Sequence, residues 1–309
     1  MMTPGAEKML VSVIIPSYNH APFLQERLQT VLMQTYGNIE LLILDDCSTD
    51  GSAQIIEKYR DNPRVRLIEL SSKNSGSPFA QWKKGIKLSK GEFIWIAESD
   101  DSCSPDFLDS VMPALEEDPL CVLSFCASLK TDASGKPLGV HPNQKRMKSL
   151  HMDGRRFARK HLAYKNAVVN ASGAVFRKSA ALSLQEDFES FRGVGDHVFW
   201  AALALKGNVA YCSRPLNYFR FHASNTTAAI KATPAGLKEA ARLAVFLRDA
   251  GISSPLKYRY FSTTVQYSLK YRCPQATSQE REEIQSLLQP DLVVRALMAA
   301  KRLKRIAIK

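Results

Sequence analysis

Short apolar runs alternate with amphipathic stretches over the first hundred residues of the chain. Four apolar runs predict β-strands, at 11–15, 41–44, 65–70 and 93–97. Three stretches with apolar residues on one face predict helices, at 21–34, 53–59 and 79–88. Strands that alternate with helices predict an α/β fold, with a mostly parallel central sheet flanked by helices on both faces.

The alternation weakens after residue 120. Three further strands and one helix are predicted, at 121–125, 171–176, 209–212 and 196–206. The stretch 129–152 is rich in Lys, Pro, Gly and His, and we expect a mobile loop there. From Pro234 onward the pattern is helical. We therefore divide the chain into an α/β domain, 9–225, and a helical C-terminal region, 226–309.

The composition is that of an ordinary globular protein. Hydrophobic residues make up 45% of the 309 positions and charged residues 23%, which excludes disordered, collagen-like and multi-span membrane proteins. The longest apolar run, 198–205, is far shorter than the roughly 20 residues that span a bilayer. There is no apolar signal core at the start, and the six cysteines contain no CxxC pair. We expect a cytoplasmic protein with reduced thiols.

The basic charge is concentrated at the C-terminal end. Residues 226–309 contain 15 Lys and Arg against 6 Asp and Glu, whereas residues 1–225 contain 27 against 24. Such a segment indicates an anionic partner: membrane headgroups, a phosphorylated lipid carrier or nucleic acid.

The last eighteen residues, 292–309, contain six basic residues, no acidic one and an apolar stripe at helical spacing. This pattern predicts an amphipathic helix on an anionic membrane surface, here the inner face of the plasma membrane. The alternative is a helix packed on the α/β domain with its charged face in water. Because the segment has no aromatic residue to stack on bases, we expect no nucleic acid partner.

Polar groups follow three of the predicted strands, as PSYN at 16–19, Asp45-Asp46, and ESDD at 98–101. In parallel sheets, ligands bind at the carboxyl ends of the strands. The turn after the first strand has no glycine, which argues against a dinucleotide oxidoreductase or a P-loop NTPase. Adjacent carboxylates suit a Mg²⁺ or Mn²⁺ ion, and the alternative is a solvated helix start capped by Asp100 or Asp101. The other acidic strand end, Asp45-Asp46, favours the interpretation of the 98–101 carboxylates as a metal site.

Two long strings carry a family resemblance: VSVIIPSYNHAPFLQERLQTVLMQTYGNIELLILDDCSTDGS from residue 11 and KGEFIWIAESDDSCSPDFL from residue 90. They resemble the N-terminal half of family 2 glycosyltransferases with the GT-A fold, and the similarity extends from residue 10 to about 226. GDHVFW at 195–200 and PLNYFRFH at 215–222 are similar to the family's acceptor-side signature. The resemblance implies a Rossmann-like GT-A domain, here with a helical C-terminal extension.

The resemblance also implies an activity. It is the inverting transfer of a sugar from a nucleotide-diphosphate-sugar donor to a hydroxyl of a polysaccharide or lipid-linked oligosaccharide, with a divalent metal, Mn²⁺ or Mg²⁺. On the donor side it implies that Pro16, Tyr18 and Asn19 line the nucleotide pocket. Asp46 would then accept hydrogen bonds from the base or ribose.

Four residues are implied around the metal and the diphosphate. Asp101 is expected as the direct metal ligand. Asp100 is expected to contact the ribose or a water molecule that is not itself coordinated to the metal. Arg220 and His222 stand at the family's R-x-H element, where either would contact the diphosphate or the metal. On this basis, Asp101→Ala is predicted to abolish metal-dependent donor binding.

Asp196 matches the family's general base, which takes the proton from the acceptor hydroxyl. The alternative is a helix N-cap, because Asp196 follows Gly195 and opens an apolar helix. Both roles are compatible, and the downstream YFRFH block favours the base.

Two departures from the family pattern concern the donor. Glu98 stands where many members carry Asp. Trp82 and Lys83 stand where many carry an Arg-Asn pair, so Lys83 or Lys84 would supply the charge to the donor. Trp82 would stack on the donor or lie in the core. These departures leave a rival hypothesis open, a non-catalytic nucleotide- or glycan-binding protein docked to a membrane assembly through its basic tail.

Overall fold

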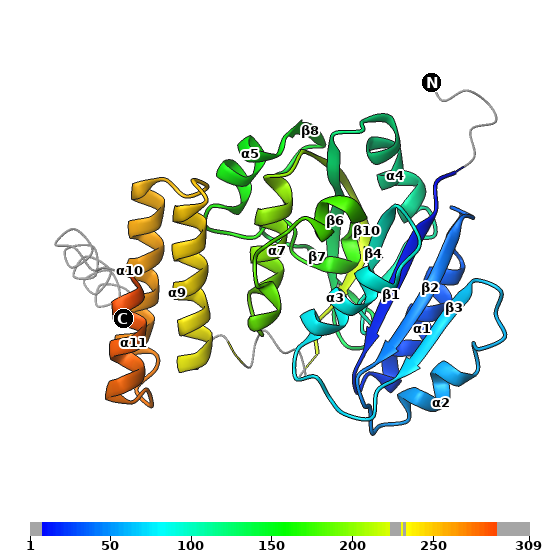
Figure 1. Ribbon diagram of the computed structural model, residues 1–309, viewed down its shortest axis with the longest axis horizontal. Helices are drawn as coiled ribbons and strands as arrows, with labels where there is room; N and C mark the ends of the chain where they lie inside the picture. The colour runs from blue at the N-terminus through cyan, green and yellow to red at the C-terminus, as the bar shows by residue number, and fades with distance from the viewer. Residues whose placement is uncertain (1–7, 223–229, 231–232, 289–309) are drawn as a thin grey trace.

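The computed structural model describes residues 8–222, 230 and 233–288, and shows a central sheet with helices on both faces (Figure 1). The sheet runs in the order β3-β2-β1-β4-β9-β6-β10-β5. Its strands are β1 Val11–Ser17, β2 Ile39–Asp45, β3 Val65–Leu70, β4 Phe93–Ile96, β5 Ser102–Cys103, β6 Cys121–Thr131, β9 Ala174–Arg177 and β10 Asn208–Arg220.

The N-terminal strands confirm the predicted parallel sheet. β1 pairs in parallel with both β2 and β4, and β2 pairs in parallel with β3. Beyond β4 the sheet is mixed, because β9 lies antiparallel between β4 and β6, while β10 is parallel to β6. It follows that β1, β4 and β10 run in the same direction and end at the same edge of the sheet.

The alternation of side chains along β1 explains why both faces are covered. Val11, Val13 and Ile15 belong to an apolar cluster with α1 Ala21–Leu32 and α4 Phe107–Glu117. Ile14 faces the opposite way, into a cluster with α3 Pro78–Leu88 and α7 Gly195–Ala204. Successive side chains of a strand point to opposite faces, so one apolar strand supplies both cores. Three shorter helices complete this part of the chain, α2 Ser52–Glu57, α5 Gly154–Phe157 and α6 Lys178–Leu182.

The predicted loop at 129–152 is wrong in part. The structure places two short strands there, β7 Pro137–Val140, antiparallel to the end of β6, and β8 Leu150–Asp153, antiparallel to the start of β10. Each strand has only four residues and no run of apolar side chains, so the sequence pattern could not indicate it. Their positions are fixed by pairing with strands distant in the sequence.

Three helices form the described C-terminal region, as predicted: α9 Pro234–Asp249, α10 Pro255–Tyr271 and α11 Ser278–Leu288. They share an apolar cluster of their own, and α9 also joins the cluster around α7 through Leu243 and Leu247 (Figure 1). Among the described residues, no helix is both long and apolar enough to cross a membrane. The expected amphipathic helix at 292–309 lies outside the described residues.

Candidate active site

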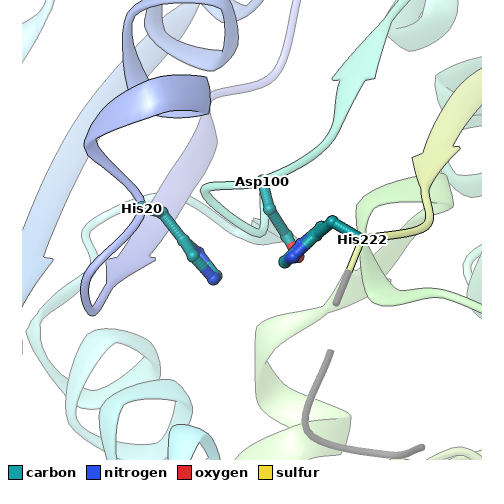
Figure 2. Close-up of side chains that lie close together, drawn as sticks. All are labelled: His20, Asp100 and His222. Carbon is teal, nitrogen blue, oxygen red and sulfur yellow. The ribbon is translucent and has the colours of Figure 1, made fainter. Parts of the chain in front are cut away.

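Three side chains from distant segments meet at the carboxyl edge of the sheet (Figure 2). His20 follows β1, Asp100 follows β4 and His222 follows β10, and their metal-ligating atoms all lie within 4.8 Å of one another. His222 Nε2 lies 2.9 Å from Asp100 Oδ2, and His20 Nδ1 lies 2.8 Å from Ser99 Oγ. Two of these residues were candidates from the sequence, whereas His20 was missed. Its signal was its position, directly after the PSYN motif.

The pKa values of Asp100 and His20 are both lowered at this site. Burial acts to raise the pKa of Asp100, but the hydrogen bond from His222 and the charges of both histidines bring that pKa below its usual value. Burial lowers the pKa of His20, against the opposing effect of Asp100. An ionised carboxylate beside a neutral imidazole is a suitable ligand pair for a divalent metal.

Asp101 is held by hydrogen bonds within the protein. It is buried, and its Oδ1 accepts from the backbone N–H of Arg220 at 3.0 Å. Its Oδ2 accepts from Asn170 Nδ2 at 2.9 Å and Ser172 Oγ at 2.7 Å. Both oxygens thus have hydrogen-bond partners inside the protein; Asp101 as the direct metal ligand stays a prediction, and Asp100 is the aspartate of the three-residue group.

Two buried arginines hold the backbone of the 98–101 loop. Arg27 Nε donates to the carbonyl of Glu98 at 2.9 Å, and Arg220 Nε donates to the carbonyl of Asp100 at 2.9 Å. Arg220 also donates to the carbonyl of Ala133 and to Glu26 Oε2. Its guanidinium therefore anchors the loop, and its expected contact with the diphosphate or the metal stays a prediction. Arg27 was missed, although an arginine on the apolar face of α1 was a visible signal.

Trp82 lies in the core, which is one of the two alternatives for this residue. It is only 2% exposed and its ring packs edge-on against Phe79 and Phe199. Its indole Nε1 donates to Glu98 Oε1 at 2.8 Å. Burial and the neighbouring charges of Asp100 and Asp101 raise the pKa of Glu98 to about 8. Glu98 is therefore protonated at neutral pH and is a poor metal ligand in this state.

The two lysines of α3 form ion pairs at the surface. Lys83 pairs with Glu189, in the 3₁₀ turn η3 Phe188–Ser190, and Lys84 pairs with Glu69 of β3. Neither ion pair includes a member of the three-residue group of His20, Asp100 and His222. Their contact with the donor stays a prediction.

Asp46 and Asn19 organise the loops of the expected nucleotide side. Asp46 accepts from Ser75 N at 2.9 Å and from Gln81 Nε2 at 2.6 Å. Asn19 has a left-handed backbone, with φ 52°, and its Oδ1 accepts from Thr49 N at 2.8 Å, which joins the loops after β1 and β2.

The other two residues expected at the nucleotide differ in exposure. Pro16 is buried within β1, paired with Leu44 of β2, whereas the Tyr18 side chain next to it is 48% exposed. Tyr18 is thus accessible to a ligand at this edge, and the place of Pro16 in the nucleotide pocket stays a prediction.

Asp196 lies in the first turn of α7 and not at its N-cap, which is Val194. The N-cap alternative is therefore wrong, although a carboxylate in the first turn still benefits from the helix dipole. Asp196 Oδ2 accepts from Asn166 Nδ2 at 2.9 Å, and burial raises the pKa of the carboxyl to about 6. Such a carboxylate is ionised at neutral pH and can still accept a proton. Asn166 was missed by the sequence analysis.

The segment 166–172 connects the two acidic parts of the site. Asn166 donates to Asp196, whereas Asn170 and Ser172 donate to Asp101. This segment precedes β9, the antiparallel strand beside β4. Asp196, the candidate base, and the 98–101 loop are therefore both held by the short segment 166–172.

Comparison with known proteins gives a family and several relatives. A family model described as "Glycosyl transferase family 2" matches residues 12–183. TuaG of Bacillus subtilis, named as a glycosyltransferase of teichuronic acid biosynthesis, is 29% identical over 207 residues, which are 66% of this chain and 75% of TuaG. The poly(ribitol-phosphate) beta-N-acetylglucosaminyltransferase TarS of Staphylococcus aureus is 33% identical over 111 residues, 35% of this chain and only 19% of TarS.

Solved structures of glycosyltransferases share the fold. TarS 1–349 in complex with UDP-GlcNAc superposes with a TM-score of 0.64 at 18% identity, covering 90% of this chain and 79% of that one. The mannosyltransferase PcManGT of Pyrobaculum calidifontis, in complex with GDP-Man and Mn²⁺, gives 0.55 at 16% identity, covering 96% and 80%. These likenesses confirm the expected GT-A fold.

Proposed function

This chain belongs to glycosyl transferase family 2, and we propose that it is an inverting, metal-dependent enzyme that transfers a sugar from a nucleotide-diphosphate-sugar to a glycan hydroxyl. The observation that carries the proposal is the group formed by His20, Asp100 and His222. It brings three metal-ligating side chains together at the edge where parallel sheets bind their ligands.

The donor set fits a divalent metal. Asp100 would supply an oxygen ligand, and His20 and His222 would supply nitrogen ligands. When bound, the metal would neutralise the diphosphate charge that develops as the sugar–phosphate bond breaks. Two imidazoles among three ligands favour a first-row transition ion such as Mn²⁺ over Mg²⁺, which prefers an all-oxygen environment.

Asp196 would act as the general base. Its ionised carboxylate takes the proton of the attacking acceptor hydroxyl, on the face of the sugar opposite the leaving diphosphate. Asn166 orients this carboxylate through the hydrogen bond to Oδ2. The burial that raises the Asp196 pKa also makes it a stronger base than an exposed aspartate.

We propose that Pro16, Tyr18, Asn19 and Asp46 bind the nucleoside part of the donor. TarS and PcManGT are complexed with UDP-GlcNAc and GDP-Man, which supports a nucleotide-sugar donor for this chain without naming its base. Asp46 would exchange one of its present hydrogen bonds, from Ser75 or Gln81, for a donor group of the base or ribose.

For the acceptor we propose a growing polysaccharide or a lipid-linked oligosaccharide at the inner face of the plasma membrane. TuaG and TarS are named for teichuronic acid biosynthesis and for poly(ribitol-phosphate), which supports a polymeric acceptor for this chain. The excess of basic residues in 226–309 is consistent with an anionic surface nearby.

A thermal-shift panel of UDP, GDP, dTDP and CDP, each with Mn²⁺, with Mg²⁺ and without metal, tests the proposal. We expect one nucleotide to raise Tm by about 2 °C or more at millimolar concentration, only with metal, and at a lower concentration of Mn²⁺ than of Mg²⁺. His20→Ala should raise the Mn²⁺ concentration required by about tenfold or more.

His151→Ala is the matched control for this panel. His151 Nε2 also lies 2.9 Å from a carboxylate, that of Asp118, but the pair lies outside the three-residue group. The control variant should respond like the wild type. If no nucleotide stabilises the protein with any metal, the donor-binding proposal is wrong.

The pH dependence of turnover should show the pKa of Asp196. With the metal saturating, kcat is expected to fall as the pH drops below about 6, because the protonated carboxyl cannot accept the acceptor's proton. Asn166→Ala removes a hydrogen bond that stabilises the ionised form. The Asp196 pKa then rises, and the acidic limb of the kcat profile should move to higher pH. If the acidic limb of the kcat profile does not move in Asn166→Ala, the limb reports the pKa of a group other than Asp196.

A further inference from the structure

The C-terminal helix α9 contacts the loop that leads into the candidate base. Glu239 of α9 accepts two hydrogen bonds from consecutive backbone amides, Arg192 N to Oε1 and Gly193 N to Oε2, both at 2.8 Å. The Glu239 residue is only 9% exposed. Asp196 follows three residues after Gly193, in the first turn of α7.

A second side chain of the same helix reinforces this contact. The guanidinium of Arg242, one turn after Glu239, lies 4.0 Å from the centre of the Phe191 ring, and its Nη2 donates to Ser190 Oγ at 2.7 Å. Two residues of α9 therefore hold the four consecutive residues 190–193.

The opposite side of this loop contacts α3 and the turn before it. Ser77 Oγ donates to the carbonyl of Phe191 at 3.3 Å, and Lys83 pairs with Glu189. The backbone is closely enclosed at Gly195, where a Cβ would lie 2.6 Å from both the carbonyl of Phe188 and the ring of Phe79. The entry to α7 is thus fixed between the sheet domain and α9.

The carboxylate of Glu239 has a specific effect on this arrangement. Its two oxygens bind two successive peptide groups, which fixes the orientation of the backbone as well as its position. A buried carboxylate that lost these partners would carry a large desolvation cost, so the contact is maintained. The orientation of a catalytic group matters strongly, because a misplacement of about 1 Å can lower a rate by about 10²-fold.

We propose that Glu239 is a positioning residue for the transfer reaction: it holds residues 192–193 so that Asp196 faces the acceptor hydroxyl. The C-terminal helices then form part of the acceptor side of the active site. This inference rests on the proposed role of Asp196 as the base.

Glu239→Gln and Glu239→Ala test this inference in the full chain. Both variants should lower kcat, by about tenfold or more for Ala, while the KM for the donor and the metal-dependent nucleotide shift stay at wild-type values. Gln keeps one acceptor oxygen at the same volume and should lose less activity than Ala. If the Ala variant does not fold, the Gln variant decides.

Lys238→Ala is the matched control on the same helix. It removes the exposed ion pair between Lys238 and Glu283 of α11 but does not touch the loop, so kcat should stay unchanged. A lower Tm with wild-type kcat in the Glu239 variants would reduce Glu239 to a structural residue and overturn the inference. A parallel loss of nucleotide binding would overturn it too, because the loop would then serve the donor site. Failure of the proposed function is seen separately, as full activity in Asp196→Asn.

Discussion

Asp196→Asn is expected to lower kcat by about 10²- to 10⁴-fold, while the metal-dependent binding of the donor nucleotide stays at the wild-type level. The amide has the shape of the carboxylate and keeps the helix start intact, but it cannot take a proton from the acceptor. The measurement is the turnover of nucleotide-sugar with saturating acceptor, beside a thermal shift with nucleotide and metal.

Asp187→Asn is the matched control, because Asp187 is an exposed aspartate shortly before the same helix. It should leave kcat unchanged.

A second measurement, the pH dependence of Tm, tests whether Asp196→Asn is folded. Because burial raises the pKa of Asp196 to about 6, its ionisation costs the folded state stability as the pH rises through 6. The variant should therefore gain Tm relative to the wild type at pH 8 and not at pH 4. Normal turnover in Asp196→Asn would contradict the assignment of the base.

Asp100→Asn and Asp101→Asn are expected to fail in different ways. Asp100→Asn should fold and lose the metal-dependent nucleotide shift, because it removes the carboxylate of the three-residue group. Asp101→Asn should lower the stability of the protein itself, by about 1–3 kcal/mol, because an amide cannot accept from all of Asn170, Ser172 and the Arg220 amide. Thermal unfolding with and without Mn²⁺ and nucleotide separates the two effects.

The aspartates are adjacent in sequence, so each variant controls for the other. Suppose that Asp101→Asn lost metal-dependent binding at full stability and Asp100→Asn did not. Asp101 would then be the metal ligand, as the family resemblance implies, and the assignment of this role to Asp100 would be contradicted. If neither variant changed the metal response, the metal site would have to be sought elsewhere in the chain.

The same variants address the rival hypothesis of a non-catalytic binding protein. A binding protein would keep the nucleotide shift but show no turnover that depends on Asp196. The Asn166-bound carboxylate of Asp196 favours the enzyme, since a binding protein does not need a base. Glu98, whose presence in place of Asp kept the rival open, accepts a hydrogen bond from the buried Trp82, and burial together with the charge of Asp100 raises its pKa.

Much of the fold follows from local sequence patterns. The strands at 11–17 and 65–70 and the helix at 78–88 are continuous apolar or amphipathic segments, so their periodicity specified them without reference to the rest of the chain. The strand ends PSYN, DD and ESDD identified the functional edge of the sheet, because ligands of parallel sheets bind there. Asp100, His222 and Asp196 were candidates for this reason together with the family resemblance.

Tertiary structure alone decided which of these polar groups point to a ligand. Asp100 and Asp101 are neighbours with the same side chain, yet Asp101 is enclosed by donors from 170–172 and from β10, segments about seventy and one hundred and twenty residues away. Arg220, expected at the diphosphate or the metal, is shown by the structure to anchor the 98–101 loop. No local pattern can encode such contacts, because they depend on which segments the folded chain brings together.

The sequence by itself therefore determined the fold class and predicted the candidate functional edge of the sheet and the proposed chemistry, since each depends on periodicity or on motifs within one segment. Only the tertiary structure decided that His20 joins Asp100 and His222, that Asn166 orients Asp196, and that Glu239 holds the loop before it. The physical reason is the same for all three. A hydrogen bond or a metal ligand set depends on distances of a few ångströms between residues that lie from thirty to two hundred positions apart in the chain.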